Sequence, residues 1–232
     1  APAAGAEVPT ARALTSGKVR AEIYSVPDSD PDAMYVGLNE RDPAWHDVYK
    51  IKISTGERTL IQENKDRYVG VIFDNVDKLR LALRSTQSGS TEVLRINPYG
   101  TSTKIYECGV LEYCAPIRFH KDNKQIYMSS NTGDTDLTEL ILLNVETAAV
   151  TKVESDPLKR VDFGAANFSD VTDEIIATVY EDDKDRIYFK DKKFEADYNH
   201  IKKQLGDSSI SFSSSTKDES KFIVTEIGRA HV

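Results

Sequence analysis

The amino-acid sequence predicts an all-β protein, and more closely a β-propeller built from four-stranded antiparallel blades. Apolar and polar residues alternate with a period of two along many short segments, as they do in half-buried strands. Turn sequences centred on Gly56, Gly100 and Thr147 recur 44 and 47 residues apart, each between two strand-like segments. Two further candidate strands precede each of these hairpins. Four strands in a repeat of about 40–50 residues are typical of a propeller blade.

The length of the chain sets the number of blades. Its 232 residues have room for about five such repeats, whereas a complete propeller has about 4–8 blades. We therefore expect about five blades and an incomplete ring. A β-sandwich with regularly spaced turns is the alternative that this pattern leaves open.

The individual strands follow from the alternation. Tyr49, Ile51 and Ile53 alternate with lysines, and the three leucines from Leu79 to Leu83 alternate with arginine and alanine. We expect these apolar side chains to pack between sheets. The predicted strands are residues 48–53, 58–61, 79–83, 91–96, 104–107, 117–120, 125–129, 139–144, 149–153, 174–180, 186–190, 209–213 and 221–225. Turn sequences rich in Gly, Asn, Asp, Ser and Pro separate them.

One segment has the period of a helix. Phe194, Tyr198, Ile201 and Leu205 are spaced by four, three and four residues, with charged residues between them. This spacing predicts an amphipathic helix of about three turns, and Gly206 is a natural C-terminal stop. We interpret the helix as an addition to the edge of a blade.

Composition and charge exclude several classes of function. The chain has 30 Lys and Arg against 38 Asp and Glu, a formal net charge of −8. A nucleic-acid partner would require a basic face. The longest apolar runs, such as residues 140–143, are far shorter than the roughly 18 residues of a membrane helix. We therefore expect a soluble protein, cytoplasmic or exported, that binds neither nucleic acid nor membranes.

The two ends of the sequence suggest a piece of a longer protein. The first residues contain no basic segment followed by an apolar one, so no signal peptide is visible. Either a signal peptide was removed, or the chain is an internal piece of a longer one. The strand pattern stops after Thr225, and back-translation of residues 226–232 resembles a common sequencing adapter read as coding sequence. We expect residues 1–226 to be a propeller fragment and residues 227–232 to be a non-native tail.

Candidate catalytic residues are absent from the sequence pattern. A serine-hydrolase elbow requires Gly-x-Ser-x-Gly, which does not occur. Ser88 and Ser90 fall in a polar hairpin turn, and residues 213–215 are predicted to form a loop. We therefore assign no catalytic residue, and we expect the chain alone to be inactive.

Candidate metal and cofactor sites are equally weak. His46, His120, His200 and His231 show no metal-ligand spacing, and we expect a hydrogen bond across a blade from His46. Cys108 and Cys114 can form a local disulfide or remain buried thiols.

The acidic segments do not change this assessment. Asp28, Asp30 and Asp32 alternate as in a calcium loop, but Ala33 and Asn39 replace the expected Gly and Glu. Residues 181–185 are expected to be a solvated turn. We assign no metal-binding or cofactor-binding residue and no cofactor.

One segment resembles a known family. Residues 34–51 read Met-Tyr-Val-Gly-Leu-Asn-Glu-Arg-Asp-Pro-Ala-Trp-His-Asp-Val-Tyr-Lys-Ile and lead to Thr55-Gly56-Glu57. They resemble propeller sequences of the prolyl oligopeptidase family, in the bacterial branch similar to acylaminoacyl-peptidases and dipeptidyl aminopeptidases. Weaker likenesses extend the resemblance over most of residues 11–225.

The resemblance implies a role within a serine peptidase. Members of the family join a propeller, which filters and orients short peptide substrates, to a C-terminal α/β-hydrolase domain that carries a Ser-Asp-His triad. Nothing in this chain matches the triad. The implied partners are that hydrolase domain and peptide substrates. The alternatives are a freestanding propeller that binds other proteins and, less well supported, a propeller enzyme with its own central site.

Overall fold

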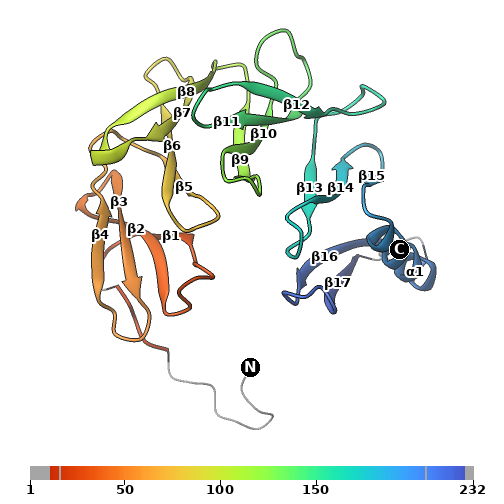
Figure 1. Cartoon of the computed structure of the whole chain (residues 1–232), viewed down its shortest axis with the longest axis horizontal. Coiled ribbons are helices and arrows are strands. Elements are labelled where there is room, and N and C mark those ends of the chain that lie inside the picture. The colour runs from red at the N-terminus through yellow and green to blue at the C-terminus, as the bar shows by residue number, and fades with distance from the viewer. Residues whose placement is uncertain (1–10, 16, 207, 228–232) are drawn as a thin grey trace. The chain divides into compact units, whose positions relative to one another are not determined.

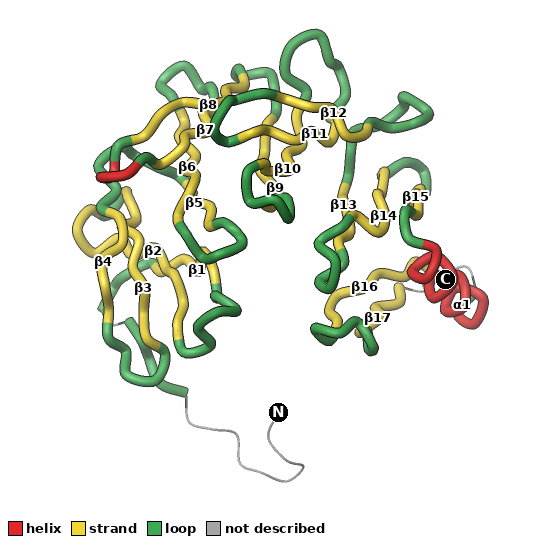
Figure 2. The backbone as a smooth tube through the Cα atoms, in the orientation of Figure 1, coloured by secondary structure: helices red, strands yellow, loops and turns green. Residues whose placement is uncertain are grey.

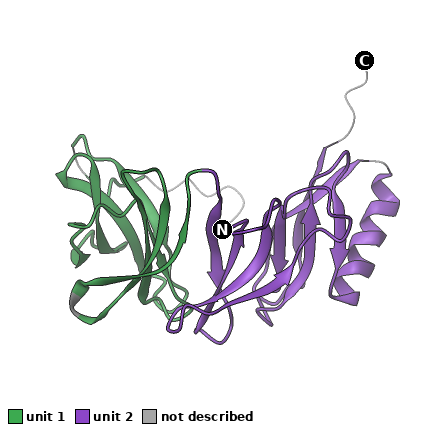
Figure 3. Ribbon diagram, turned by 90° about the horizontal axis from the view of Figure 1, so that it is seen from above, with its two compact units in different colours: residues 1–110 green, residues 111–232 purple. Residues whose placement is uncertain are grey.

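The computed structural model describes residues 11–15, 17–206 and 208–227. These residues belong to two compact units, which divide after Val110 (Figure 3). In this part of the chain, seventeen strands form five antiparallel sheets, and every pair of neighbouring strands is also adjacent in sequence. Figures 1 and 2 show these sheets together with one α-helix.

The first unit contains two four-stranded sheets. Its strands are β1 (Ala21–Ser25), β2 (Ala33–Asp42), β3 (Trp45–Lys52) and β4 (Arg58–Gln62) in one sheet, and β5 (Gly70–Phe73), β6 (Leu79–Ser85), β7 (Thr91–Ile96) and β8 (Ser102–Cys108) in the other. A 3-10 turn, Pro98–Gly100, joins β7 to β8.

The second unit contains sheets of four, three and two strands. They are β9 (Cys114–Phe119), β10 (Gln125–Ser130), β11 (Glu139–Asn144) and β12 (Val150–Glu154), then β13 (Ala165–Phe168), β14 (Ile175–Tyr180) and β15 (Arg186–Phe189), and finally β16 (Ser209–Ser215) and β17 (Phe222–Ile227). The helix α1 (Lys192–Leu205) lies between β15 and β16 in sequence.

The predicted repeat corresponds to these sheets. The hairpins between β3 and β4, β7 and β8, and β11 and β12 occupy the three recurring turns, so each is the connection between the third and fourth strands of a sheet. Each contains a residue in the left-handed region, Gly56 (φ 79°), Gly100 (φ 81°) and Ala148 (φ 58°). The equivalent position in the third repeat is thus Ala148, one residue after the predicted centre. Meandering four-stranded units of this kind are the blades of a β-propeller, which confirms the predicted fold class. Three of the five sheets of the described residues have the predicted four strands, and the other two have three and two.

The central strands of the sheets carry the core. Ile51 is 1% exposed and Leu81 is fully buried, while the other predicted core residues of β3 and β6 are half-buried. Ala82 is also fully buried although it is adjacent to Leu81. Successive side chains of a strand point to opposite faces, so both faces of β6 are covered. Within the first unit, the rings of Tyr35 in β2 and Phe73 in β5 contact each other across its two sheets, 4.3 Å apart and tilted by 32°.

The second unit has an aromatic core. Tyr127, Leu140, Phe163 and Tyr180 form one buried cluster, which draws on the four-stranded and the three-stranded sheet. The Phe163 and Tyr180 rings meet edge to face at 6.0 Å, an arrangement that aromatic quadrupoles favour.

The helix confirms the prediction made from its spacing. It begins two residues earlier than expected because the Asp191 carboxylate accepts a hydrogen bond from the Phe194 amide at 2.7 Å and caps the N-terminus. Gly206, with φ 68°, ends it and donates its N–H to the Lys202 carbonyl at 2.9 Å. Phe194 is 7% exposed and fixes the helix to β15 and β16.

Two ambiguous segments of the sequence have definite structures. Cys108 and Cys114 are both disulfide-bonded, so the disulfide alternative holds and the free-thiol alternative is wrong. Ile227 lies in β17 opposite Ser209, and residues 228–232 of the predicted tail lie outside the described residues.

Within the described part of the chain, no helix is both long and apolar enough to cross a membrane.

Candidate functional site

The residues singled out from the sequence have separate local roles. Asp30 pairs with Lys50 at 2.8 Å, and the Asp32 carboxylate accepts hydrogen bonds from the Ser54 N–H at 2.7 Å and its hydroxyl at 2.5 Å. Asp30 thereby binds a residue of β3, and Asp32 binds a residue of the turn that follows β3. No group of three or more His, Cys, Asp or Glu side chains arranged to hold a metal ion is found among the described residues.

The histidines do not gather into a site. His46 Nε2 is buried without a hydrogen-bond partner, so the predicted bond across the blade is wrong for this nitrogen. His120 Nδ1 lies 3.1 Å from an Asp122 carboxylate oxygen in the turn before β10. His200 Nε2 is 2.8 Å from Gln204 on the exposed side of α1. His231 lies outside the described residues.

The serines differ from the prediction in one respect. Ser88 lies in the predicted hairpin turn, where its hydroxyl is 2.8 Å from that of Thr86. Ser213–Ser215, predicted as a loop, belong instead to β16, since Ser214 and Ser215 are opposite Ile223 and Phe222 of β17. The sequence did not reveal this extension because three serines show no apolar alternation, and backbone pairing to β17 determines the strand.

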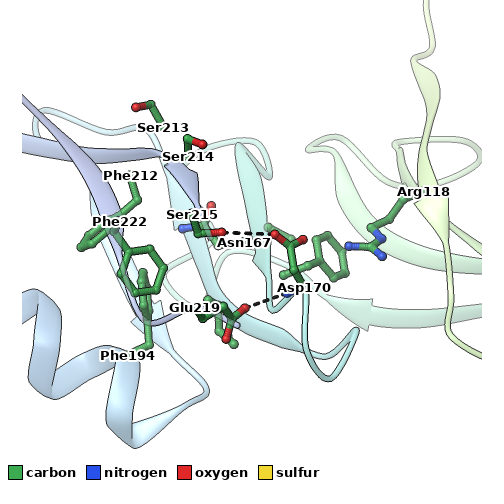
Figure 4. A pocket seen from close by; sticks show the side chains of 13 residues that line it. Arg118, Asn167, Asp170, Phe194, Phe212, Ser213, Ser214, Ser215, Glu219 and Phe222 are labelled. Atoms are coloured by element: carbon green, nitrogen blue, oxygen red, sulfur yellow. Dashed lines mark hydrogen bonds between the residues drawn. The ribbon is translucent and has the colours of Figure 1, made fainter. Parts of the chain in front are cut away.

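Ser213–Ser215 also line the cavity that is the candidate site. It has a volume of about 430 Å³ and lies wholly within the second unit (Figure 4). Its walls come from β9, β13, the turn after β13, α1, and the hairpin of β16 and β17. Pockets of about 300–1,000 Å³ accommodate small ligands. The cavity is therefore large enough for a short peptide segment.

Two carboxylates form the polar side of the site. Glu219 accepts a hydrogen bond from the Asp170 N–H at 2.7 Å, and the Ser215 hydroxyl donates to the Asp170 carboxylate at 3.2 Å. Glu219 is held in the left-handed region, φ 53°, by the turn between β16 and β17. Within the described residues neither carboxylate forms an ion pair. The site therefore offers acceptors and negative charge to a ligand.

The turn beside Glu219 is closed by hydrogen bonds of its own. The Asp218 carboxylate accepts hydrogen bonds from the Thr216 hydroxyl at 2.6 Å and from the N–H and hydroxyl of Ser220. These bonds lower the pKa of Asp218 to about 2, because they stabilise the ionised form. Asp218 thus remains charged next to the site at neutral pH.

Phenyl rings form the apolar side. Phe194 and Phe212 lie 5.2 Å apart, and Phe212 meets Phe222 edge to face at 5.4 Å. Figure 4 shows these three rings on one side of the site and Asp170 with Arg118 on the other. Three elements that are separate in sequence, α1, β16 and β17, supply the rings. Helix α1 was interpreted only as an addition to a blade edge, so its contribution to the site was missed.

Arg118 supplies the positive charge of the site. Its guanidinium lies 4.8 Å above the Phe168 ring and pairs with the Asp173 carboxylate at 2.6 Å. Both contacts hold the side chain at the rim, where 31% of it remains exposed. Cation–π contacts of this type orient a guanidinium while leaving its edge accessible. The site can therefore bind a ligand that combines charged, hydrogen-bonding and apolar groups, such as a peptide.

Comparison with known proteins gives two findings. No protein-family model matches the chain. Over 209 residues, 89% of this chain, the sequence is 27% identical to dipeptidyl aminopeptidase BIII of Pseudoxanthomonas mexicana. The chain spans 30% of the length of that relative. The resemblance to peptidase sequences is thus confirmed by one relative at 27% identity. The branch of the family stays a prediction.

Solved structures support the fold. The chain is similar to TolB from Acinetobacter baumannii with a TM-score of 0.52 and 14% identity, over 76% of this chain and 41% of that one. At this identity the similarity concerns the β-propeller architecture alone.

Proposed function

We propose that this chain is part of the substrate-gating β-propeller of a prolyl oligopeptidase-family serine peptidase that acts on short peptides. The observation that carries the proposal is the 27% identity to a dipeptidyl aminopeptidase over 89% of the chain. The hydrolytic chemistry then belongs to an α/β-hydrolase domain in another part of the longer protein. The propeller restricts access to that domain and helps to hold the amino-terminal side of the peptide.

The chemistry of the candidate site supports a peptide ligand. Asp170 and Glu219 offer acceptors for an ammonium group or for peptide N–H groups, and Arg118 offers donors for carbonyl oxygens. The phenyl rings of α1, β16 and β17 provide an apolar surface for a side chain. The same combination of apolar lining and a few placed polar groups is typical of ligand pockets.

The test compares this chain with the full-length product of its gene. The full-length protein is expected to hydrolyse dipeptidyl p-nitroanilides and to react with a fluorophosphonate probe, whereas the 232-residue chain does neither. Gating predicts in addition that the full-length protein cleaves short peptides but leaves folded proteins intact.

The opposite results would identify a different function. Fluorophosphonate labelling of the 232-residue chain, after removal of contaminants, would show that it carries a nucleophile of its own. A full-length product that is neither labelled nor hydrolytic would favour a freestanding, protein-binding propeller.

A further inference from the structure

A second cavity in the same unit lies against two strand edges. It has a volume of about 880 Å³ and is lined by three consecutive residues of β9, Ala115 to Ile117, and by Gly164 with the first two residues of β13, Ala165 and Ala166. Successive side chains of a strand point to opposite faces of its sheet. Three residues in a row can line one cavity only if the backbone edge of the strand faces it. The cavity therefore exposes main chain as well as side chains.

Both strands are the outermost strands of their sheets. Within the described residues β9 pairs only with β10, and β13 pairs only with β14. Half of the N–H and C=O groups of such an edge point away from its single neighbour and can pair with another extended chain. Pro116 removes one donor from β9, whereas β13 contains no proline and begins at the exposed Ala165, directly after the exposed Gly164. The edge of β13 is thus the better template.

The edge of β13 also connects this larger cavity with the candidate site. Ala166 lines both of them, Gly164 and Ala165 line the larger one, and Asn167 and Phe168 line the candidate site. These five consecutive residues span about 16 Å at 3.3 Å per residue. A single line of backbone therefore runs from the larger cavity into the site.

The side chains around the larger cavity define what it can accept. Ile117 (41% exposed), Leu137 and the buried Phe163 provide an apolar surface. Asp136 and Asp162 provide negative charge, and no Lys or Arg is among the lining residues. Asp162 is fixed by a hydrogen bond from the Thr138 N–H at 2.7 Å. Neither carboxylate has an ion pair in the described part of the chain.

We propose that an extended peptide of about five residues binds as an additional strand along β13. Its main chain pairs with the free edge of β13, from Ala165 to Phe168. One apolar side chain lies against Ile117, Leu137 and Phe163, and a positively charged group lies beside Asp136 and Asp162. The inference goes beyond the proposed function, since it concerns binding by this chain alone and requires no hydrolysis.

The test uses fluorescence anisotropy with fluorescein-labelled Val-Ala-Val-Ala-Lys amide and the 232-residue chain. Amide N–H groups of a strand alternate between its two sides. N-methylation of either both valines or both alanines is therefore expected to abolish binding in one of the two methylated peptides and to leave it nearly unchanged in the other. A peptide that binds through side chains alone would not distinguish the two sets in this way.

A charge variant tests whether the positively charged group of the peptide lies beside Asp136. Asp136→Asn is expected to weaken binding of the lysine peptide by about threefold to fivefold and to leave binding of the norleucine analogue unchanged. Asp183→Asn is the matched control, because Asp183 is 97% exposed and does not line the cavity. Equal thermal midpoints of the two variants confirm that both are folded.

Three results would overturn the proposal. The first is the absence of binding at millimolar peptide, and the second is equal binding of both N-methylated peptides. The third is an Asp136→Asn variant that binds the lysine peptide as well as the Asp183→Asn control does. None of these results depends on peptidase activity, so they leave the proposed function to its own test.

Discussion

Replacing Asp47 with alanine is expected to destabilise the protein through the loss of one buried acceptor. Asp47 lies in β3, and its side chain is 2% exposed. Its carboxylate accepts hydrogen bonds from the Asn64 N–H at 2.7 Å and from two nitrogens of Arg41 at 2.8 Å each. The Asn64 side chain in turn bonds the N–H and the C=O of Tyr68 at 2.8 and 2.9 Å. Asp47 therefore anchors the connection from β4 to β5.

The size of the destabilisation follows from the hydrogen bond that each partner of Asp47 loses. Asn64 is 4% exposed, so its N–H remains buried without an acceptor, which costs about 1–3 kcal/mol. The Arg41 side chain is 39% exposed and can return to water, so it adds little. For a chain of this length, 1 kcal/mol corresponds to about 2–4 °C in thermal midpoint. The expected decrease is therefore about 2–12 °C.

Thermal unfolding followed by circular dichroism at neutral pH measures this decrease. Glu57→Ala is the matched control, since Glu57 is an exposed carboxylate in the turn between β3 and β4 of the same sheet. Asp47→Asn should lie between the wild type and Asp47→Ala, because its amide oxygen can still accept the Asn64 N–H. Equal midpoints for Asp47→Ala and Glu57→Ala would refute the anchoring role of Asp47.

Three further predictions concern acid stability, close packing and the helix. Burial alone would raise the pKa of Asp47, but its hydrogen bonds outweigh burial and lower it. The native state therefore binds fewer protons than the unfolded one, and the stability from Asp47 is lost as the pH falls below about 4. Urea titrations across this range should show a smaller loss for Asp47→Asn than for the wild type. Gly164→Ala places a Cβ 2.8 Å from a backbone carbonyl oxygen, and Gly70→Ala places one 3.8 Å from a side chain. Only the former should lose stability in urea unfolding, by about 1–3 kcal/mol. Phe194→Ala removes a ring that is 7% exposed and should cost about 3–5 kcal/mol in the same assay; an unchanged urea midpoint would contradict the docking of α1 through this ring.

The hairpins were predictable from the sequence because local chemistry determines them. Gly56 and Gly100 adopt left-handed conformations that glycine enters without steric cost, and alternating apolar residues flank them. The strands beside such turns were correspondingly well located, and β7 and β11 begin and end where the sequence predicts. Local signals of this kind depend little on the rest of the fold.

The first strands of the sheets were harder to predict. β1, β5 and β13 contain only four or five residues, and their burial patterns show no fully buried position. A strand at a sheet edge needs little apolar alternation, because one neighbour and the backbone bonds to it fix its place. Without that alternation, no bounds for them could be predicted from the sequence.

The candidate site could not be predicted because it is assembled by tertiary structure. Arg118, Asp170 and Glu219 are separated by about fifty residues each, and no spacing rule connects them. The segment that carries the family resemblance, residues 34–57, has by contrast a structural role. Its Asp47 is buried and, with its partner Arg41, anchors a blade, which explains why a recognisable string contains no site residue.

The pairing of every strand with a sequence neighbour has a consequence for how the chain reaches its native state. Among the residues that the structure describes, each sheet forms from consecutive strands, so the loop that closes each contact is short and its entropic cost is small. Ribosomes add about 5–20 residues per second, which is slow compared with the roughly 1–10 μs in which a hairpin forms. Each sheet can therefore be completed before the next has been synthesised, and the order of folding follows the order of translation.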